Sequence, residues 1–266
     1  MNRFLRAVAV GIALATASAG CGGSSSGDTP SAGSSPSSSA NAVTGTINVF
    51  AASSLTEAFT TLGKQFEAAH PGVKVVFNFG PSSGLSEQIN QGSPADVFAS
   101  ASTKSMDEVV AAGGASGPTP FVKNVMEVAV PPSNPAHVAS VNDLAKTGVK
   151  VALCQAQVPC GSTAASVFAN AHITVKPVTE EVDVKSVLSK VELDEVDAGV
   201  VYVTDVRAAG SKVKGITISP GVNASTTYPI AALTKARNAT TAQAFVSYVL
   251  SPAGIAVLTA AGFQQP

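Results

Sequence analysis

Short β-branched runs alternate with helical patterns along most of this chain of 266 residues. The β-branched runs lie at residues 46–50, 73–79, 96–99, 125–130, 149–153, 199–203 and 213–218. The clearest helical patterns lie at residues 55–69, 84–90, 104–112, 162–170, 184–192, 241–250 and 252–261. Strands that alternate with helices predict the α/β fold class. In open α/β sheets ligands bind beyond the carboxyl ends of the strands, so the loops that follow the strands are where we expect a site.

Two of those loops share one design, in which a strand runs into a pair of serines and then into a helix. The first loop contains Ser53 and Ser54, and the second contains Ser82 and Ser83. The first N–H groups of a helix have no intrahelical partner and lie at the positive end of its dipole, and serine hydroxyls add further donors. Neither loop carries Lys or Arg. An anion bound there would therefore be held by neutral donors.

Each serine loop also has a simpler interpretation as a helix cap. Serine is a preferred N-cap residue, and the spacing of Ser54 and Glu57 fits a capping box, in which the serine and the glutamate satisfy each other's backbone N–H groups. For either loop alone, capping is the better explanation. The anion interpretation gains weight from the repetition and from three further turns at the same edge of the sheet, which contain Cys160, Val184 and Tyr202. Taken alone, Tyr202 fits an ordinary half-buried strand tyrosine.

The N-terminus has the pattern of an export signal. Arg3 and Arg6 precede an apolar stretch at residues 7–17, which is shorter than the ~20 residues that a transmembrane helix needs. Cys21 follows small residues, as in the lipobox of bacterial lipoproteins, although Ser18 stands where that motif usually has leucine. We expect a signal peptide at residues 1–20 and a lipid on Cys21. An ordinary signal cleavage or a disulfide at Cys21 is the alternative.

Residues 21–42 are rich in serine and glycine and carry a single charge, so they are expected to form a flexible tether. The chain is therefore expected to be exported and anchored to the outer face of the cell membrane. Its net charge is −1 and its 16 basic residues are scattered, a pattern that does not favour a nucleic-acid partner.

Beyond Cys21 the chain has two cysteines, Cys154 and Cys160. In an exported protein such a pair favours a disulfide, and free or metal-bound thiols are the alternative. The three histidines lie at no recognisable metal-ligand spacing, so we expect no direct ligands to a metal ion and no cofactor.

With these turns assembled, the chain resembles the periplasmic molybdate-binding proteins of bacterial ABC transporters over essentially all of residues 46–266. The motifs that carry the resemblance are VFAASSLT at residues 49–56, SPADVFASA at 93–101, VPCG at 158–161, GVVY at 199–202, and SPAG at 251–254 with GF at 262–263. Together they are far more specific than any one of them.

The resemblance implies a set of neutral donors to the oxyanion: two serine hydroxyls, two backbone N–H groups and one tyrosine hydroxyl. They fall on Ser54, Ser82, Cys160, Val184 and Tyr202, with Ser53 and Ser83 as secondary candidates. The family commonly has alanine where this chain has Cys160. A main-chain donor tolerates that change, and a disulfide to Cys154 would stiffen the loop.

The resemblance also implies a type II periplasmic-binding-protein fold, with two α/β lobes, two chain crossings and a ligand cleft between the lobes. The crossings are expected near residues 124–127 and 227–230, with residues 43–125 and 229–266 in lobe 1 and residues 126–228 in lobe 2. Closure of the lobes completes the donor shell, and an ABC permease with its ATPase recognises the closed form.

We therefore expect a monomeric binding protein for molybdate or tungstate, in contact with the membrane only through Cys21. A binding protein for sulfate, thiosulfate or phosphate is the first alternative, and a surface sensor or adhesion module on the same fold is the second. An enzyme is not expected, because the chain lacks a Gly-x-Ser-x-Gly elbow and nothing places a histidine beside a serine turn.

Overall fold

The structure is a computed structural model that describes residues 42–266. The expected signal peptide at residues 1–20, the lipidated Cys21 and nearly all of the tether expected at residues 21–42 lie outside the described residues. Among the described helices, none is by itself long and apolar enough to cross a membrane. Only α7 (Ala239–Val249) and α8 (Pro252–Ala261), taken together across a bend of 60°, meet that test.

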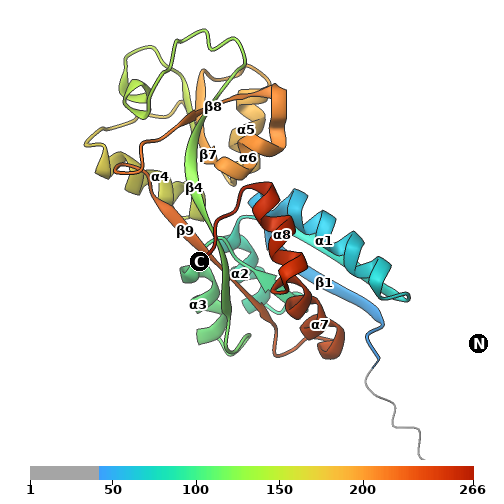
Figure 1. The fold of residues 1–266 in the computed structure, drawn as a ribbon. Helices are drawn as coiled ribbons and strands as arrows, with labels where there is room; N and C mark the ends of the chain where they lie inside the picture. Colours follow the sequence, from blue (N-terminus) through green and yellow to red (C-terminus); the bar gives the residue numbers. More distant parts are fainter. Residues whose placement is uncertain (1–41) are drawn as a thin grey trace, which may run out of the picture. The chain divides into compact units, whose positions relative to one another are not determined.

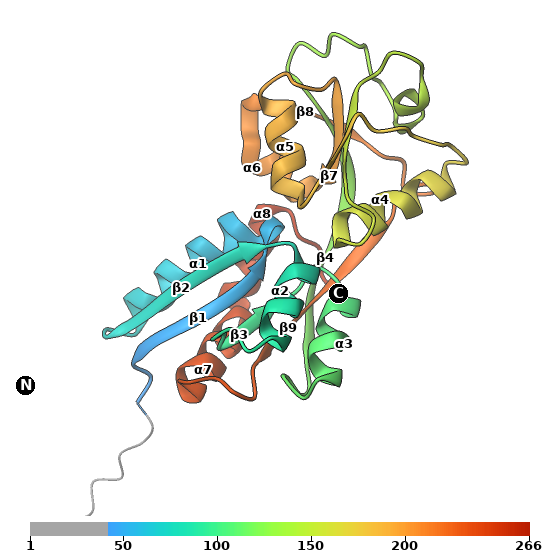
Figure 2. The same cartoon turned by 180° about the vertical axis from the view of Figure 1, so that it is seen from behind.

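The described chain has the expected two-lobed α/β fold, and the first lobe is a sheet with helices on both faces. Its strands follow the order β2 (Val73–Gly80), β1 (Gly45–Ala52), β3 (Val97–Ala99), β9 (Ser225–Ala232) and β4 (Thr119–Val130). β1 pairs in parallel with β2 and β3, whereas β9 runs antiparallel to β3 and to β4. Helices α1 (Thr56–Ala69), α7 and α8 cover one face, and α2 (Ser82–Asn90) and α3 (Thr103–Ala111) cover the other (Figures 1 and 2).

The side chains of β1 explain why both faces of this sheet are covered. Successive side chains of a strand point to opposite faces. Ile47 and Val49 share a core with Phe59 of α1, while Phe50 packs in a separate core with Leu85 of α2. Because β1 is buried on both sides, the turn at its carboxyl end, which begins with Ser53, is held inside the molecule.

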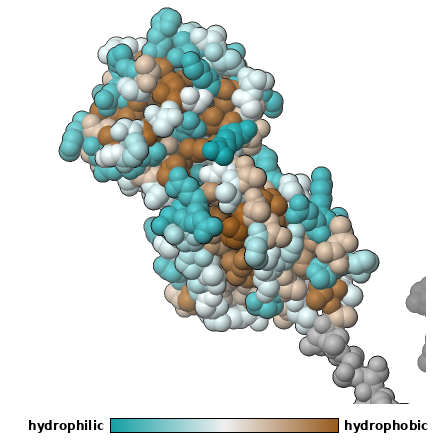
Figure 3. All heavy atoms as spheres, viewed as in Figure 1, coloured by the Kyte–Doolittle hydropathy of each residue, from teal (hydrophilic) through white to brown (hydrophobic). Residues whose placement is uncertain are grey.

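The second lobe continues the sheet beyond β4. β4 is followed by β7 (Ala198–Tyr202), β5 (Val151–Cys154) and β6 (Thr179–Glu181), and β8 (Lys214–Thr217) also pairs with β4. The helices of this lobe are α4 (Pro159–Asn170), α5 (Val184–Glu192) and α6 (Val203–Ala209). Its hydrophobic core is separate from those of the first lobe. On the face drawn in Figure 3, apolar residues gather in each lobe and hydrophilic residues lie around them.

Two stretches of chain join the lobes. β4 pairs with β9 as far as Val125, which lies opposite Ser225, and from Met126 onward it pairs with β7 and β8. The chain returns just before β9, where the amide of Asn223 donates to the Met126 carbonyl at 2.8 Å and accepts from the Met126 N–H at 3.2 Å. The two crossings therefore lie side by side. The assignment of residues 43–125 with 229–266 and of residues 126–228 to the two lobes stays a prediction.

The largest differences from the sequence-based expectation concern three strands and one helix. β9 and β6 are additional strands, β4 starts six residues before the expected strand at 125, and α6 follows β7 directly. β9 contains Pro229, and proline is normally excluded from central strands because it has no N–H. Here Pro229 lies opposite Pro120 of β4, next to a shift in register. The Pro229 carbonyl still accepts from the Ser100 N–H at 3.0 Å.

Candidate functional site

A cleft between the two lobes brings together the N-termini of four helices and the end of one strand. The helices are α2, α4, α5 and the short 3-10 helix η1 (Ser53–Leu55) that leads into α1, and the strand is β7. The volume that the centre of a water-sized molecule can occupy in the cleft is about 20 Å³. Its lining residues are Ala52, Ser53, Ser54, Gly80, Pro81, Ser82 and Ala101 from the first lobe and Val158, Pro159, Cys160, Asp183, Val184 and Tyr202 from the second.

The cleft contains every residue that the sequence singled out as a primary candidate. These are Ser54, Ser82, Cys160, Val184 and Tyr202, and the secondary candidate Ser53 joins them. Ser83, the other secondary candidate, does not line the cleft and is half-buried on α2. Cys160 and Val184 lie in the first turns of α4 and α5, where the helix provides no acceptor for their backbone N–H groups.

The serines of the two loops do not cap their helices. The Ser54 hydroxyl lies 2.8 Å from the Tyr228 hydroxyl, and the Ser82 hydroxyl accepts from the Ala101 N–H at 2.9 Å. α1 and α2 have no side-chain cap, and the Glu57 carboxylate binds Lys185 instead of its own backbone. The capping interpretation is therefore wrong for both loops. In each loop, a group outside the loop forms a hydrogen bond with one serine hydroxyl: Tyr228 with Ser54, and Ala101 with Ser82.

Ser53 uses its proton differently from Ser82. The Ser53 hydroxyl donates to Asp183 Oδ2 across the cleft at 2.7 Å. The other carboxylate oxygen of Asp183 caps α5 by accepting from the Ser186 N–H at 2.8 Å. Asp183 is the only charged side chain that the described residues bring to the cleft, and each of its two oxygens accepts a hydrogen bond. Because Ser82 accepts from Ala101, its own proton is free to be donated into the cleft.

A disulfide ties the loop that carries Cys160. Cys154 at the end of β5 and Cys160 in the first turn of α4 are bonded, with their Cα atoms 5.8 Å apart, which confirms the predicted pairing. The next residue, Gly161, packs so closely against the loop that a Cβ there would lie 2.0 Å from the Gln155 carbonyl oxygen. The position of the Cys160 N–H is therefore set by a covalent bond on one side and a close backbone contact on the other.

Tyr202 presents a buried hydroxyl without a partner. Its side chain is 1% exposed, and among residues 42–266 its hydroxyl makes no hydrogen bond of good geometry, although the Thr163 and Tyr228 hydroxyls lie near enough to lower its pKa. Burial raises the pKa of Tyr202 far above its ordinary value, and burial likewise raises the pKa of Tyr228. Both phenols therefore stay protonated and can donate. A buried polar group without a partner is rare and calls for an explanation, such as a bound ion.

The donors in the cleft are suited to an anion and not to a cation. Within residues 42–266, no Lys or Arg lines the cleft, and no cluster of three or more His, Cys, Asp or Glu side chains could hold a metal ion. Hydroxyls and helix N-termini supply the positive ends of dipoles. The sequence did not point to Tyr228 and Ala101, because they reach the serines from distant parts of the chain. Asp183 was visible only as the start of a helix.

Three comparisons with known proteins agree on the family and the fold. The sequence model of the family described as bacterial extracellular solute-binding protein matches residues 47–264. The chain is 42% identical over 221 residues to the molybdate-binding protein ModA of Mycobacterium tuberculosis, which covers 83% of this chain and 85% of that protein.

Two solved structures share the fold at lower identity. The periplasmic molybdate-binding protein of Azotobacter vinelandii has a TM-score of 0.73 at 21% identity, over 83% of this chain and 99% of that one. The sulfate-binding protein SubI of Mycobacterium tuberculosis H37Rv has a TM-score of 0.73 at 18% identity, over 83% of this chain and 86% of that one. Because these two proteins are named for different anions, the fold by itself does not select the ligand.

Proposed function

Because this chain belongs to the bacterial extracellular solute-binding proteins, we propose that it captures molybdate, and tungstate with it, outside the cell and delivers the anion to an ABC permease and its ATPase. The observation that carries the proposal is the Tyr202 hydroxyl, which is buried in the cleft without a partner. An oxyanion oxygen would supply the acceptor that this hydroxyl lacks. The choice of molybdate rests on the 42% identical relative, whose name states that anion.

Five groups are proposed to bind the anion directly. They are the hydroxyls of Ser54, Ser82 and Tyr202 and the backbone N–H groups of Cys160 and Val184. If Tyr228 donates to the Ser54 oxygen, the Ser54 proton is free for the ligand, just as the Ser82 proton is free because Ala101 donates to its oxygen. Ser53 is proposed to support the site from the side, because its proton is committed to Asp183.

Neutral donors are sufficient for tight binding. A hydrogen bond to a charged group contributes about 1.5 to 3 kcal/mol net, so five such bonds supply about 8 to 15 kcal/mol before the costs of closure. A nanomolar complex needs about 12 kcal/mol. A shell of donors disfavours phosphate species that keep a proton, and the size of the shell is proposed to separate molybdate and tungstate from the smaller sulfate.

The proposal also includes a lipid anchor and a tether at the N-terminus. Cys21 is proposed to carry the lipid that anchors the protein to the outer face of the membrane, and the serine-rich segment after it is proposed to act as the tether. The mass of the mature protein extracted from membranes checks this directly. If the measured mass lacked the lipid, the proposed anchor at Cys21 would be wrong, and the proposal of an exported protein would stand without it.

Thermal unfolding of the purified protein tests the choice of anion. Molybdate, tungstate, sulfate, thiosulfate and phosphate are added separately. We expect molybdate and tungstate to raise the apparent stability by about 2.7 kcal/mol at a hundredfold excess over the dissociation constant, because they bind only the folded state. Stabilisation by sulfate or phosphate instead would assign the protein to another oxyanion. If no anion stabilised it, the proposal would be wrong and a sensor or adhesion role would be favoured.

Serine variants test the proposed ligands one by one. We expect Ser54→Ala and Ser82→Ala each to weaken molybdate binding by about 1.5 to 3 kcal/mol, since each removes one hydrogen bond to a charged ligand. Isothermal titration calorimetry measures the change. Ser83→Ala is the matched control, because Ser83 neighbours Ser82 on α2 and does not line the cleft. Equal affinity in Ser82→Ala and the wild type, or a loss in Ser83→Ala alone, would contradict the assignment.

A further inference from the structure

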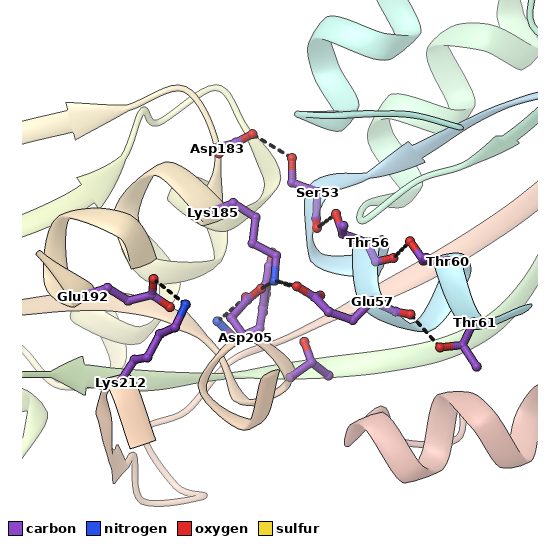
Figure 4. Close-up of polar contacts among 12 residues, drawn as sticks. Ser53, Thr56, Glu57, Thr60, Thr61, Asp183, Lys185, Glu192, Asp205 and Lys212 are labelled. Carbon is purple, nitrogen blue, oxygen red and sulfur yellow. Dashed lines mark hydrogen bonds and ion pairs between the residues drawn. The ribbon is translucent and has the colours of Figure 1, made fainter. Parts of the chain in front are cut away.

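An ion pair connects the two lobes beside the anion cleft. Lys185 Nζ of α5 lies 2.8 Å and 2.9 Å from the two carboxylate oxygens of Glu57 of α1, and 3.1 Å from Asp205 Oδ1 of α6 (Figure 4). α1 belongs to the first lobe, whereas α5 and α6 belong to the second. Of these contacts, only the one between Glu57 and Lys185 joins one lobe to the other.

The charges in this cluster are arranged so that the lobes can part without leaving a buried ion alone. Asp205 is fully buried, and its other oxygen accepts from the Tyr202 N–H at 3.1 Å. Burial acts to lower the pKa of Lys185, but the carboxylates of Asp205 and Glu57 outweigh burial and raise it, so the ammonium group stays charged. If the lobes separate, Lys185 and Asp205 remain paired within the second lobe, and only the half-exposed Glu57 leaves.

The ion pair lies close in sequence to groups that line the cleft. On α5, Val184 stands between Asp183 and Lys185, and both of these neighbours contact the first lobe. In the first lobe, Ser54 lies in sequence between Ser53 and Glu57. Ser53 donates to Asp183, and Glu57 accepts from Lys185. Figure 4 shows both contacts: Asp183, just before α5, meets Ser53 of η1, and Lys185 in the first turn of α5 meets Glu57 in the first turn of α1. They bracket the Val184 N–H and the Ser54 hydroxyl.

We propose that Glu57 and Lys185 form a latch, an ion pair that holds the first turn of α5 against the first turn of α1 and so sets the Val184 N–H opposite the Ser54 hydroxyl. This inference rests on the proposed function of the cleft as an anion site. Neither Glu57 nor Lys185 lines that cleft. Both are therefore positioning residues, which act on the retention of the anion without contacting it.

Glu57→Gln is the variant that isolates the latch. It removes the charge that pairs across the lobes, keeps the shape of the side chain and leaves the Lys185–Asp205 pair in place. Ion pairs of this exposure are modest in strength, so we expect molybdate to bind about three- to tenfold more weakly, with most of the change in a faster dissociation rate. The difference from the wild type should shrink at high salt, which screens the pair.

Glu192→Gln is the matched control, because Glu192 pairs with Lys212 at 3.5 Å within the second lobe. We expect its dissociation rate to equal that of the wild type. The direction of the Glu57→Gln effect is itself diagnostic. Removing a negative charge near an anion site would strengthen binding if only long-range repulsion mattered, whereas loss of the latch weakens it. Unchanged or tighter binding in Glu57→Gln, or an equal loss in both variants, would overturn the proposal.

The proposed function and the latch can fail separately. If the wild-type protein binds no molybdate in the same titration, the proposed function is wrong. Small-angle X-ray scattering of the same three proteins without added anion then tests the latch by itself. We expect a larger radius of gyration for Glu57→Gln than for Glu192→Gln and the wild type, because the lobes separate more readily. Equal radii would overturn the latch.

Discussion

Lys185→Met is expected to lower the free energy of unfolding by about 3 to 5 kcal/mol at pH 7, which is the usual effect of breaking a buried ion pair by removing one partner. Lys185 is the only cation paired with Asp205 among the described residues, and Asp205 is fully buried. The substitution leaves that carboxylate inside the second lobe without its counter-charge. Urea denaturation followed by circular dichroism measures the loss.

The loss in Lys185→Met should depend on pH with a definite sign. Burial raises the pKa of Asp205, and Lys185 acts to lower it, so the variant raises that pKa further. A carboxyl group whose pKa is higher in the folded than in the unfolded state binds its proton more tightly when folded. The variant should therefore have its largest and constant deficit above the folded pKa of Asp205, and it should regain stability as the pH falls through that pKa toward the unfolded value.

Two further variants keep this prediction testable. Lys212→Met removes a mostly exposed cation from the pair with Glu192 and should change stability by less than about 1 kcal/mol. Lys185→Met combined with Asp205→Asn removes both charges, keeps an oxygen that can accept from the Tyr202 N–H, and should restore much of the loss. An equal deficit in Lys185→Met at pH 5 and pH 7, or no recovery in the double variant, would contradict the assignment of the loss to Asp205.

Gly161→Ala is expected to weaken molybdate binding at least tenfold and to destabilise the protein by about 1 to 3 kcal/mol, as overpacking of a core does. The new Cβ would lie 2.0 Å from the Gln155 carbonyl oxygen and 2.8 Å from the Cys154 carbonyl oxygen. Both are backbone atoms, so they cannot rotate away as a flexible side chain would. The first turn of α4 has to move, and the Cys160 N–H moves with it.

Gly221→Ala provides the matched control for this substitution. A Cβ at Gly221 meets no atom within 4 Å, and Gly221 is not among the glycines with positive φ. It should leave both the affinity and the midpoint of thermal unfolding near the wild-type values. Calorimetric titration and thermal unfolding are measured on the same samples. A destabilised Gly161→Ala protein that binds molybdate with full affinity would show that the Cys160 N–H is not a ligand.

The helices were the part of the fold that the sequence predicted best, because their limits carry local signals. α5 runs over Val184–Glu192 as expected, since the Asp183 side chain caps it by accepting from the Ser186 N–H. α8 begins at Pro252 behind the N-cap Ser251 and ends at Gly262, whose φ of 107° is left-handed. Each of these signals lies within a few residues of the helix end that it marks.

The strands and helices that the sequence missed depend on contacts made elsewhere. β9 contains Pro229, which argues against a central strand, and its place between β3 and β4 comes from pairing with segments far away in the sequence. α6 spans only Val203–Ala209, too short for a periodic pattern to be recognised. Glu57 fits a capping box by its spacing, but Lys185, which is 128 residues away, binds its carboxylate instead.

The sequence by itself determined the class of the fold, the disulfide between Cys154 and Cys160, and the turns at which neutral donors gather. These features follow from periodicity, cysteine usage and helix N-termini, which are properties of short segments. Only the tertiary structure decided which hydroxyl protons face the cleft. Tyr228, Ala101 and Asp183 reach Ser54, Ser82 and Ser53 from 174, 19 and 130 residues away. A hydroxyl has one proton to give, so its role depends on the neighbour that folding places beside it.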